Sequence, residues 1–296
     1  MRDDGLTRRR ALGLGAAAGL GALLARPLPA LGRGTTAPRS FGLRVTAADF
    51  PGHGGVSRVL RTSRRFDLLG LRGPRGDVEV RVRRRDGRWS PWVPLAVHGD
   101  HAPDTGSGER ASDPVWTGGS HELQLRAARP VRGTLRLHLV AVPAAARRRV
   151  RPRPVARAAQ AAYPAPPPMV SRASWGADRV PPRADPSYGQ VQVGFVHHTV
   201  NANDYGPQDS AAIVLAIAKY HRDTNGWNDI GYNFLIDRYG QVFEGRAGGM
   251  ESPVVGAQAQ GYNSVSTGIA NLGTFSTAGQ TAAGLQALAR LLSWKL

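Results

Sequence analysis

Side chains that suit metal-assisted hydrolysis lie close together in the C-terminal half of this 296-residue chain. His197 and His198 end one apolar segment, Tyr232 opens a second, and Glu244 closes a third. A catalytic zinc ion takes three protein ligands and keeps a fourth position open for water. Because adjacent side chains of a strand point to opposite faces, only one of the two histidines can face a given metal. No histidine, cysteine or acidic residue follows Gln258, so the sequence predicts an incomplete metal site.

Hydrophobic periodicity in the same half predicts an α/β domain, a mixed central sheet with flanking helices. Asp209 or Ser210 can cap a helix on which Ile217 and Tyr220 share one face. Thr277 is expected to cap a final leucine-rich helix. The predicted strands span residues 191–197, 232–236, 241–244 and 267–272, and the first predicted helix spans residues 210–225.

The region 41–143 has the pattern of a smaller all-β domain that precedes the α/β domain. Val78, Val80 and Val82 alternate with charged residues, and this period of two is typical of a half-buried strand. The Asp86-Gly87 pair that follows is a strong signal for a hairpin turn. Short strands separated by glycine and proline predict a sandwich-like fold or a small barrel.

Three tryptophans of the β-rich region have two possible roles. Trp89 and Trp92 flank a Ser-Pro pair, and Trp116 lies further along the chain. Exposed indole rings could stack on sugars, whereas buried rings would belong to the hydrophobic core. The sequence favours the core and leaves the sugar-stacking surface as the alternative.

A segment from 144 to 170 is predicted to link the two domains. It contains six arginines before residue 158, no acidic residue, and the run Pro164-Ala165-Pro166-Pro167-Pro168. Repelling charges and polyproline geometry favour an extended, solvated spacer.

The formal net charge of +18 lies entirely before residue 171, because nine basic residues balance nine acidic residues from 171 to 296. Nearly all the basic charge is arginine, which can reflect genome composition or attraction to an anionic surface such as a cell wall. No helix-turn-helix, zinc-finger or RNA-binding pattern supports a nucleic-acid partner. With no cysteine in the chain, disulfides are excluded.

The first 30 residues predict export. Arg8-Arg9-Arg10 precedes a short, glycine-rich apolar run that ends near Ala25, and small residues follow near Ala30. This run is shorter than the ~20 residues that a membrane span needs. The pattern is typical of a cleaved signal peptide, and the paired arginines indicate the twin-arginine route. We therefore expect a secreted or cell-wall protein with no membrane span after signal removal.

Several motifs in order resemble those of the peptidoglycan recognition protein family, the type 2 N-acetylmuramoyl-L-alanine amidases. The resemblance covers about residues 171–296. The N-terminal β region, with its Trp-Ser-Pro-Trp, looks like the extra domain of exported actinobacterial members. The motifs are Ser-Arg-Ala-Ser-Trp-Gly from Ser171, His-His-Thr from His197, Gly-Trp-Asn-Asp-Ile-Gly-Tyr-Asn-Phe from Gly226, Glu-Gly-Arg from Glu244, Gly-Tyr-Asn from Gly261 and Gly-Ile-Ala from Gly268.

The resemblance implies a zinc-dependent amidase that cleaves the lactyl amide between N-acetylmuramic acid and L-alanine. It implies that His197 is a zinc ligand and that Tyr232 stabilises the reacting carbonyl, while Glu244 either positions water or makes a structural hydrogen bond. The groove for the muramyl peptide would be lined by His198, Thr199, His221, Trp227 and Asn263.

The resemblance also implies a preference for peptidoglycan with diaminopimelate-type stem peptides. Gly226, Trp227 and Arg246 match the family pattern for that stem, and a guanidinium can bind its extra carboxylate in a bidentate way. The remaining zinc ligands of the family lie in a His-Arg-Asp to Cys-Pro segment beyond the final helix. We therefore expect the domain 171–296 to be incomplete at its C-terminus, and a non-catalytic peptidoglycan-binding module is the alternative.

Overall fold

The structure is a computed structural model that describes residues 37–51, 55–73, 77–97, 101–105, 111–154 and 165–296. The predicted signal segment 1–30 lies outside these residues, so its assignment stays a prediction. Within the described ranges, no helix is both long and apolar enough to cross a membrane.

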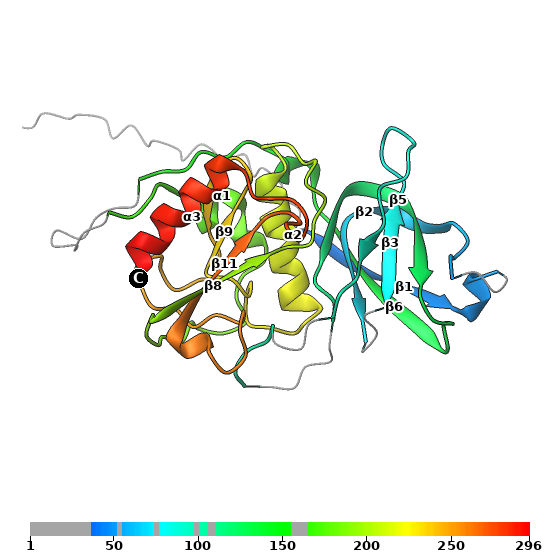
Figure 1. Cartoon of the computed structure of the whole chain (residues 1–296), viewed down its shortest axis with the longest axis horizontal. Helices are drawn as coiled ribbons and strands as arrows, with labels where there is room; N and C mark the ends of the chain where they lie inside the picture. The colour runs from blue at the N-terminus through cyan, green and yellow to red at the C-terminus, as the bar shows by residue number, and fades with distance from the viewer. Residues whose placement is uncertain (1–36, 52–54, 74–76, 98–100, 106–110, 155–164) are drawn as a thin grey trace, which may run out of the picture. The chain divides into compact units, whose positions relative to one another are not determined.

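The first half of the described chain forms a six-stranded sheet in which every strand pair is antiparallel (Figure 1). The predicted alternation is confirmed, because Val78, Val80 and Val82 are buried against Leu123 and Leu125. The strand order is β1-β6-β2-β5-β3-β4. The strands are β1 (Arg39–Thr46), β2 (Leu60–Arg72), β3 (Val78–Val82), β4 (Val93–Pro94), β5 (Val115–Ala127) and β6 (Thr134–Ala141).

The second half forms the predicted mixed sheet, of which Figure 1 labels β8, β9 and β11. The strand order is β7-β10-β9-β11-β8. Strands β8, β11 and β9 run parallel to one another, and β9 and β10 form the predicted antiparallel hairpin. The strands are β7 (Met169–Val170), β8 (Val193–His198), β9 (Phe234–Ile236), β10 (Val242–Glu244) and β11 (Ser266–Asn271).

In the part of the chain that the structure describes, three α-helices accompany this sheet: α1 (Arg172–Trp175), α2 (Ser210–Asp223) and α3 (Ala282–Lys295). Side chains alternate along a strand, so the two faces of the sheet meet different helices. Leu235 and Ala270 share a core with α2, whereas Phe234 and Ile269 share a core with α3. The N-cap of α3 is Thr281, whose hydroxyl accepts a hydrogen bond from the Gly284 amide. The predicted cap at Thr277 is therefore wrong; Thr281 stands directly before the helical run.

Helix α2 is buried along almost its whole length and joins the two halves of the molecule into one core. Its residues Ala211 to Ala218 are 1% exposed or less. The same cluster includes Leu68, Trp116 and Val140 of the first sheet. A run of small and aliphatic residues suits a helix that is apolar on every side, because such a helix can be buried on every side.

Arg147 shows that the segment after β6 is not fully solvated. Its guanidinium donates to Asp67 Oδ1 and to Asp209 Oδ1, each at 2.5 Å, and it lies over the ring of Trp116. The Asp67 side chain is 2% exposed, and a buried carboxylate requires a paired charge. The prediction of a solvated spacer is wrong for this residue, while residues 155–164 of the linker lie outside the described ranges.

Candidate functional site

His197 and His198 end β8 and point to opposite faces, as expected. His197 pairs with Ala270 of β11 and shares the α2 side of the sheet with it. His198 lies on the α3 side, where its Nδ1 accepts a hydrogen bond from the Phe275 amide at 3.2 Å. Of the two histidines, only His197 can therefore act together with the side chains around α2.

Those side chains form an aromatic cluster. The ring of Tyr232 lies 5.8 Å from His197 and 5.6 Å from His221, measured between centroids. The ring of Trp227 lies 4.6 Å from His221. Four residues that the sequence singled out are thus brought together from β8, from α2 and from the loop that precedes β9.

Gly226 allows the chain to turn from α2 into this loop. Its φ of +77° lies in the left-handed region that glycine adopts without steric cost. The Trp227 amide then donates to the His221 carbonyl at 3.1 Å. The turn returns the Trp227 indole to the end of α2, which explains its contact with His221.

Burial controls the protonation of the cluster. His221 is 2% exposed, and burial lowers its pKa to about 3. The charge of Asp113 acts to raise this pKa, whereas His101 and Arg246 lower it further. Its Nδ1 accepts a hydrogen bond from the Gly231 amide at 3.0 Å, which a neutral ring can do. Burial also raises the pKa of Tyr232 well above its ordinary value, with Asp113 adding to the shift. Near neutral pH the cluster therefore holds a neutral imidazole and a protonated phenol.

The low pKa of His221 makes stability depend on pH. In the unfolded chain this group takes up a proton near pH 6.5, but in the folded chain only near pH 3. The stability from its neutral burial is present above pH 6.5 and is lost as the pH falls toward 3. Between pH 7 and pH 5 we expect His221 to account for a fall of about 2 kcal/mol in the free energy of unfolding.

Urea denaturation at these two pH values compares the wild type with His221→Asn, whose amide oxygen can replace Nδ1 as an acceptor. In the variant, the free energy of unfolding should change much less between pH 7 and pH 5 than in the wild type. If the free energy of unfolding of the variant decreases as much as that of the wild type, the assignment of the low pKa to His221 is contradicted.

The structure does not bring Glu244 to the cluster. Glu244 pairs with Phe234, which belongs to the α3 side of the sheet, and strands β9 and β11 separate β10 from β8. Three strand spacings of ~4.8 Å place its backbone about 14 Å from that of His197. Its Oε2 accepts a hydrogen bond from the Arg172 amide at 2.9 Å, which is the structural alternative that the sequence left open.

Arg246 lies against the loop that carries Gly226 and Trp227. Its Nη1 donates to the Ile230 carbonyl at 3.2 Å, and burial lowers its pKa while the charge of Asp229 opposes that shift. Asp229 holds the same region together, because it pairs with Arg172 at 3.0 Å and accepts from the Ala247 amide. Arg246 is therefore held against the same loop that carries Gly226 and Trp227, the other two residues of the predicted stem-specificity set.

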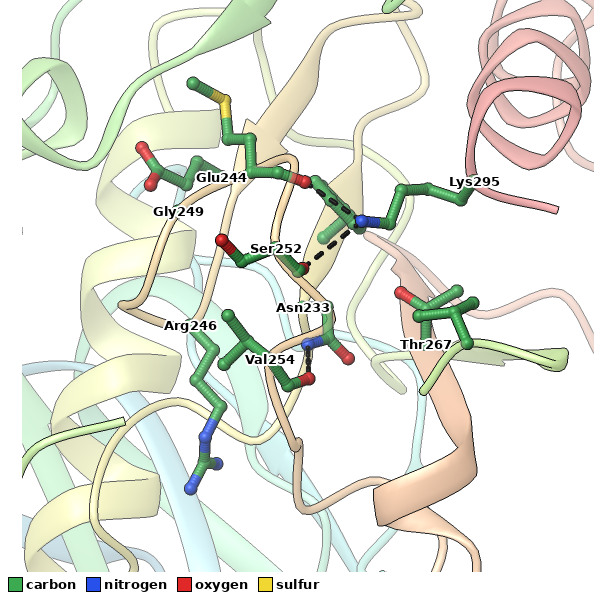
Figure 2. Close-up of a pocket in the computed structure, with 11 residues that line it drawn as sticks. Asn233, Glu244, Arg246, Gly249, Ser252, Val254, Thr267 and Lys295 are labelled. Carbon is green, nitrogen blue, oxygen red and sulfur yellow. Dashed lines mark hydrogen bonds between the residues drawn. The ribbon is translucent and has the colours of Figure 1, made fainter. Parts of the chain in front are cut away.

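Figure 2 shows a small cavity lined by Glu244, Arg246 and Lys295, in which the Arg246 guanidinium points away from Lys295. Its volume is about 10 Å³, close to the minimum for a single water molecule. Lys295 instead closes this region by donating to the carbonyls of Met250, Glu251 and Ser252. The cavity is a packing feature and not a substrate site.

Two other predicted groove residues are engaged within the fold. Thr199 is 2% exposed, and its hydroxyl accepts a hydrogen bond from the Gly273 amide at 3.1 Å. Asn263 is 1% exposed, and its amide nitrogen donates to the Ala102 carbonyl at 2.9 Å and to Asp104 Oδ1 at 2.6 Å. Both side chains are therefore occupied by protein partners in this structure.

Sequence reasoning missed His101, which the first half of the chain contributes. Its ring meets His197 edge to face at 4.5 Å between centroids, and its Nδ1 lies 3.4 Å from Asp113 Oδ1. No motif marks a single histidine in a loop of another region, so only the fold could reveal this neighbour.

The zinc ion that the resemblance implies does not find a full set of ligands in the described part of the chain. These residues contain no group of three or more His, Cys, Asp and Glu side chains that could hold a metal. His197 and His101 come together, but a catalytic zinc takes three protein ligands.

Two protein families match successive parts of the chain. Residues 28–166 match the Rv3811 N-terminal galactose-binding domain-like family, and residues 187–296 match the N-acetylmuramoyl-L-alanine amidase family.

Individual relatives match the same C-terminal region. The chain is 39% identical to peptidoglycan-recognition protein SC2 of Drosophila simulans over 42% of this chain and 65% of that protein. It is 38% identical to the N-acetylmuramoyl-L-alanine amidase of Homo sapiens over 39% of this chain and 20% of that protein. The chain thus spans less than two thirds of the length of either relative.

One similar solved structure is that of peptidoglycan recognition protein-LE in complex with tracheal cytotoxin, a monomeric diaminopimelic acid-type peptidoglycan. It aligns with 42% of this chain. The match covers 71% of that chain, with 32% identity and a TM-score of 0.39. Residues 187–296 thus form a domain of the N-acetylmuramoyl-L-alanine amidase family, and the same region is similar to peptidoglycan-recognition proteins.

Proposed function

We propose that residues 171–296 recognise the stem peptide of peptidoglycan and belong to an amidase that acts on the bond between N-acetylmuramic acid and L-alanine. The observation that supports this most is the meeting of His197, His221, Tyr232 and Trp227 in one cluster. These residues come from three separate elements, and the family resemblance assigns all four to the substrate site.

In this proposal Tyr232 supplies a hydrogen-bond donor. Burial keeps its hydroxyl protonated, and a buried donor aimed at a reacting carbonyl stabilises the negative charge that develops on the oxygen. His221 keeps the loop before β9 in place through its bond from the Gly231 amide. The family implies zinc at His197; since the described residues do not complete its ligand set, the proposal for binding does not depend on the metal.

We further propose that the stem peptide is of the diaminopimelate type. The carboxylate of diaminopimelate that lysine lacks would pair with Arg246, which the Ile230 carbonyl holds against the loop that also carries Trp227. Burial of this guanidinium strengthens an interaction with an anion, because screening by water falls. Peptidoglycan in a secreted or cell-wall location is the partner that this proposal names.

Calorimetry with two muramyl tripeptides, one ending in diaminopimelate and one in lysine, tests the proposal on the whole chain. We expect tighter binding of the diaminopimelate form. Arg246→Ala should weaken that binding by about 1.5–3 kcal/mol, the range for a hydrogen bond to a charged group, and should leave binding of the lysine form nearly unchanged.

Arg290→Ala on α3 is the matched control, since it removes the same charge from a helix that does not contact the cluster. Equal affinities for the two tripeptides would refute the stem preference. No binding of either tripeptide would refute peptidoglycan recognition by this region.

A further inference from the structure

A large cavity among the described residues lies apart from the cluster around His197. It has a volume of about 960 Å³, which is within the range for small-ligand sites. Neither His197 nor Tyr232 lines it. Its walls come from β3, from the turn and strand β4 that follow, from the start of β5, and from the loops after β8, β9 and β11.

Three loops of the second sheet lie together at this cavity because the strands that precede them are parallel. Asn201 follows β8, Arg238 follows β9, and Thr274 follows β11, and these three strands run parallel. Loops beyond the carboxyl ends of parallel strands lie side by side, and this is where open α/β sheets bind ligands.

The cavity carries an excess of positive charge. Its lining contains five arginines, at positions 81, 84, 85, 147 and 238, and two aspartates, at positions 204 and 209. Arg84 pairs with Asp204 at 2.9 Å and Arg147 pairs with Asp209 at 2.5 Å. Within the described residues, no acidic side chain forms an ion pair with Arg81, Arg85 or Arg238.

The guanidinium of Arg81 is already held in place before any ligand binds. The guanidinium of Arg81 lies 4.6 Å from the ring centre of Trp92 and 4.9 Å from that of Trp89. It also donates from Nε and Nη2 to the Gln124 side chain, at 3.0 and 2.6 Å. An immobilised guanidinium loses little entropy when it binds an anion, so Arg81 is pre-organised to bind one.

The buried side chain of Asn201 is independent evidence for a ligand in this cavity. The residue is fully buried, its Oδ1 accepts a hydrogen bond from the Trp116 amide at 3.3 Å, and its Nδ2 has no hydrogen-bond partner in the structure. Leaving a buried donor unsatisfied costs about 1–3 kcal/mol. An oxygen-rich ligand in the cavity could satisfy this group.

We propose that this cavity binds an acidic oligosaccharide that carries carboxylate groups. Arg81, Arg85 and Arg238 would bind the carboxylates, and Asn201 would donate to a ring or hydroxyl oxygen. The cavity has room for a ligand larger than a single small anion, and the half-buried indole of Trp92 provides an apolar edge for a sugar ring. The site is separate from the stem-peptide site, so the first half of the chain has a specific binding role in addition to its general charge.

Calorimetry of the whole chain with tetragalacturonate, and with the neutral tetrasaccharide chitotetraose, tests the proposal. We expect binding of tetragalacturonate and none of chitotetraose. Arg85→Ala should weaken binding about tenfold, and so should Arg81→Gln, which corresponds to the loss of one charge-assisted hydrogen bond. Arg85 is exposed, so its replacement tests the site without disturbing the core.

Arg44→Ala is the matched control, because Arg44 is exposed on β1 at the far edge of the same sheet. It should leave binding unchanged, and so should Arg246→Ala, which separates this result from the stem-peptide proposal. Equal weakening by Arg44→Ala would show attraction by net charge alone and overturn the proposal. Equal binding of chitotetraose, or tighter binding of inorganic polyphosphate than of tetragalacturonate, would also overturn it.

Discussion

Replacing Arg147 by alanine is expected to lower the free energy of unfolding by about 3–5 kcal/mol, the range for breaking a buried ion pair by removing one partner. Arg147 pairs with both Asp67 and Asp209, and the Asp67 side chain is 2% exposed. In the variant, Asp67 stays buried and keeps the more exposed Arg65 as an ion-pair partner. Chemical denaturation followed by circular dichroism measures the effect.

Arg149→Ala is the control from the same arginine run, because this side chain is exposed. It should change stability by less than about 0.5 kcal/mol, as is usual for surface substitutions. Similar small effects of both replacements would show that Arg147 belongs to a solvated spacer, as its sequence context predicts.

Replacing Tyr220 by alanine is expected to cost about 3–5 kcal/mol and to destabilise both halves of the molecule together. The side chain is fully buried on α2, and its hydroxyl donates to the Ser112 carbonyl at 3.2 Å. It also fills the space beside Gly70, where a Cβ would lie 2.0 Å from the tyrosine oxygen. Truncation therefore removes packing that the two halves share.

Tyr220→Phe keeps the ring and removes only the hydrogen bond, so it should cost about 1 kcal/mol. Tryptophan fluorescence and far-ultraviolet circular dichroism should report the same single transition in all three proteins, since one core contains residues of both sheets. Two separate transitions in the wild type would contradict the shared core.

Local sequence patterns determined the elements of this fold. The alternation of Val78, Val80 and Val82 specifies a strand with one buried face, and the aliphatic run of α2 specifies a helix. The two-residue period of β8 also determines that His197 and His198 face opposite sides. These outcomes depend on the bonding geometry of neighbouring residues, which the sequence contains directly.

Resemblance between motifs, and not their spacing, indicated the candidate site. It predicted His197, His221, Trp227 and Tyr232 as site residues, and the structure brings these four together. It did not reveal that Glu244 lies on the other face of the sheet, because that depends on the order in which β8 to β11 pair. Strand order is decided by contacts between residues far apart in the chain.

The tertiary structure alone decided how the first half of the chain contributes. His101 meets His197, Arg147 pairs with both Asp67 and Asp209, and Arg81 reaches the same cavity as Asn201. In the sequence these are a single histidine, one arginine among many, and an ordinary asparagine. Burial and charge pairing give such residues their roles, and both arise only when distant segments pack together, because the cost of an unpaired buried group depends on its surroundings.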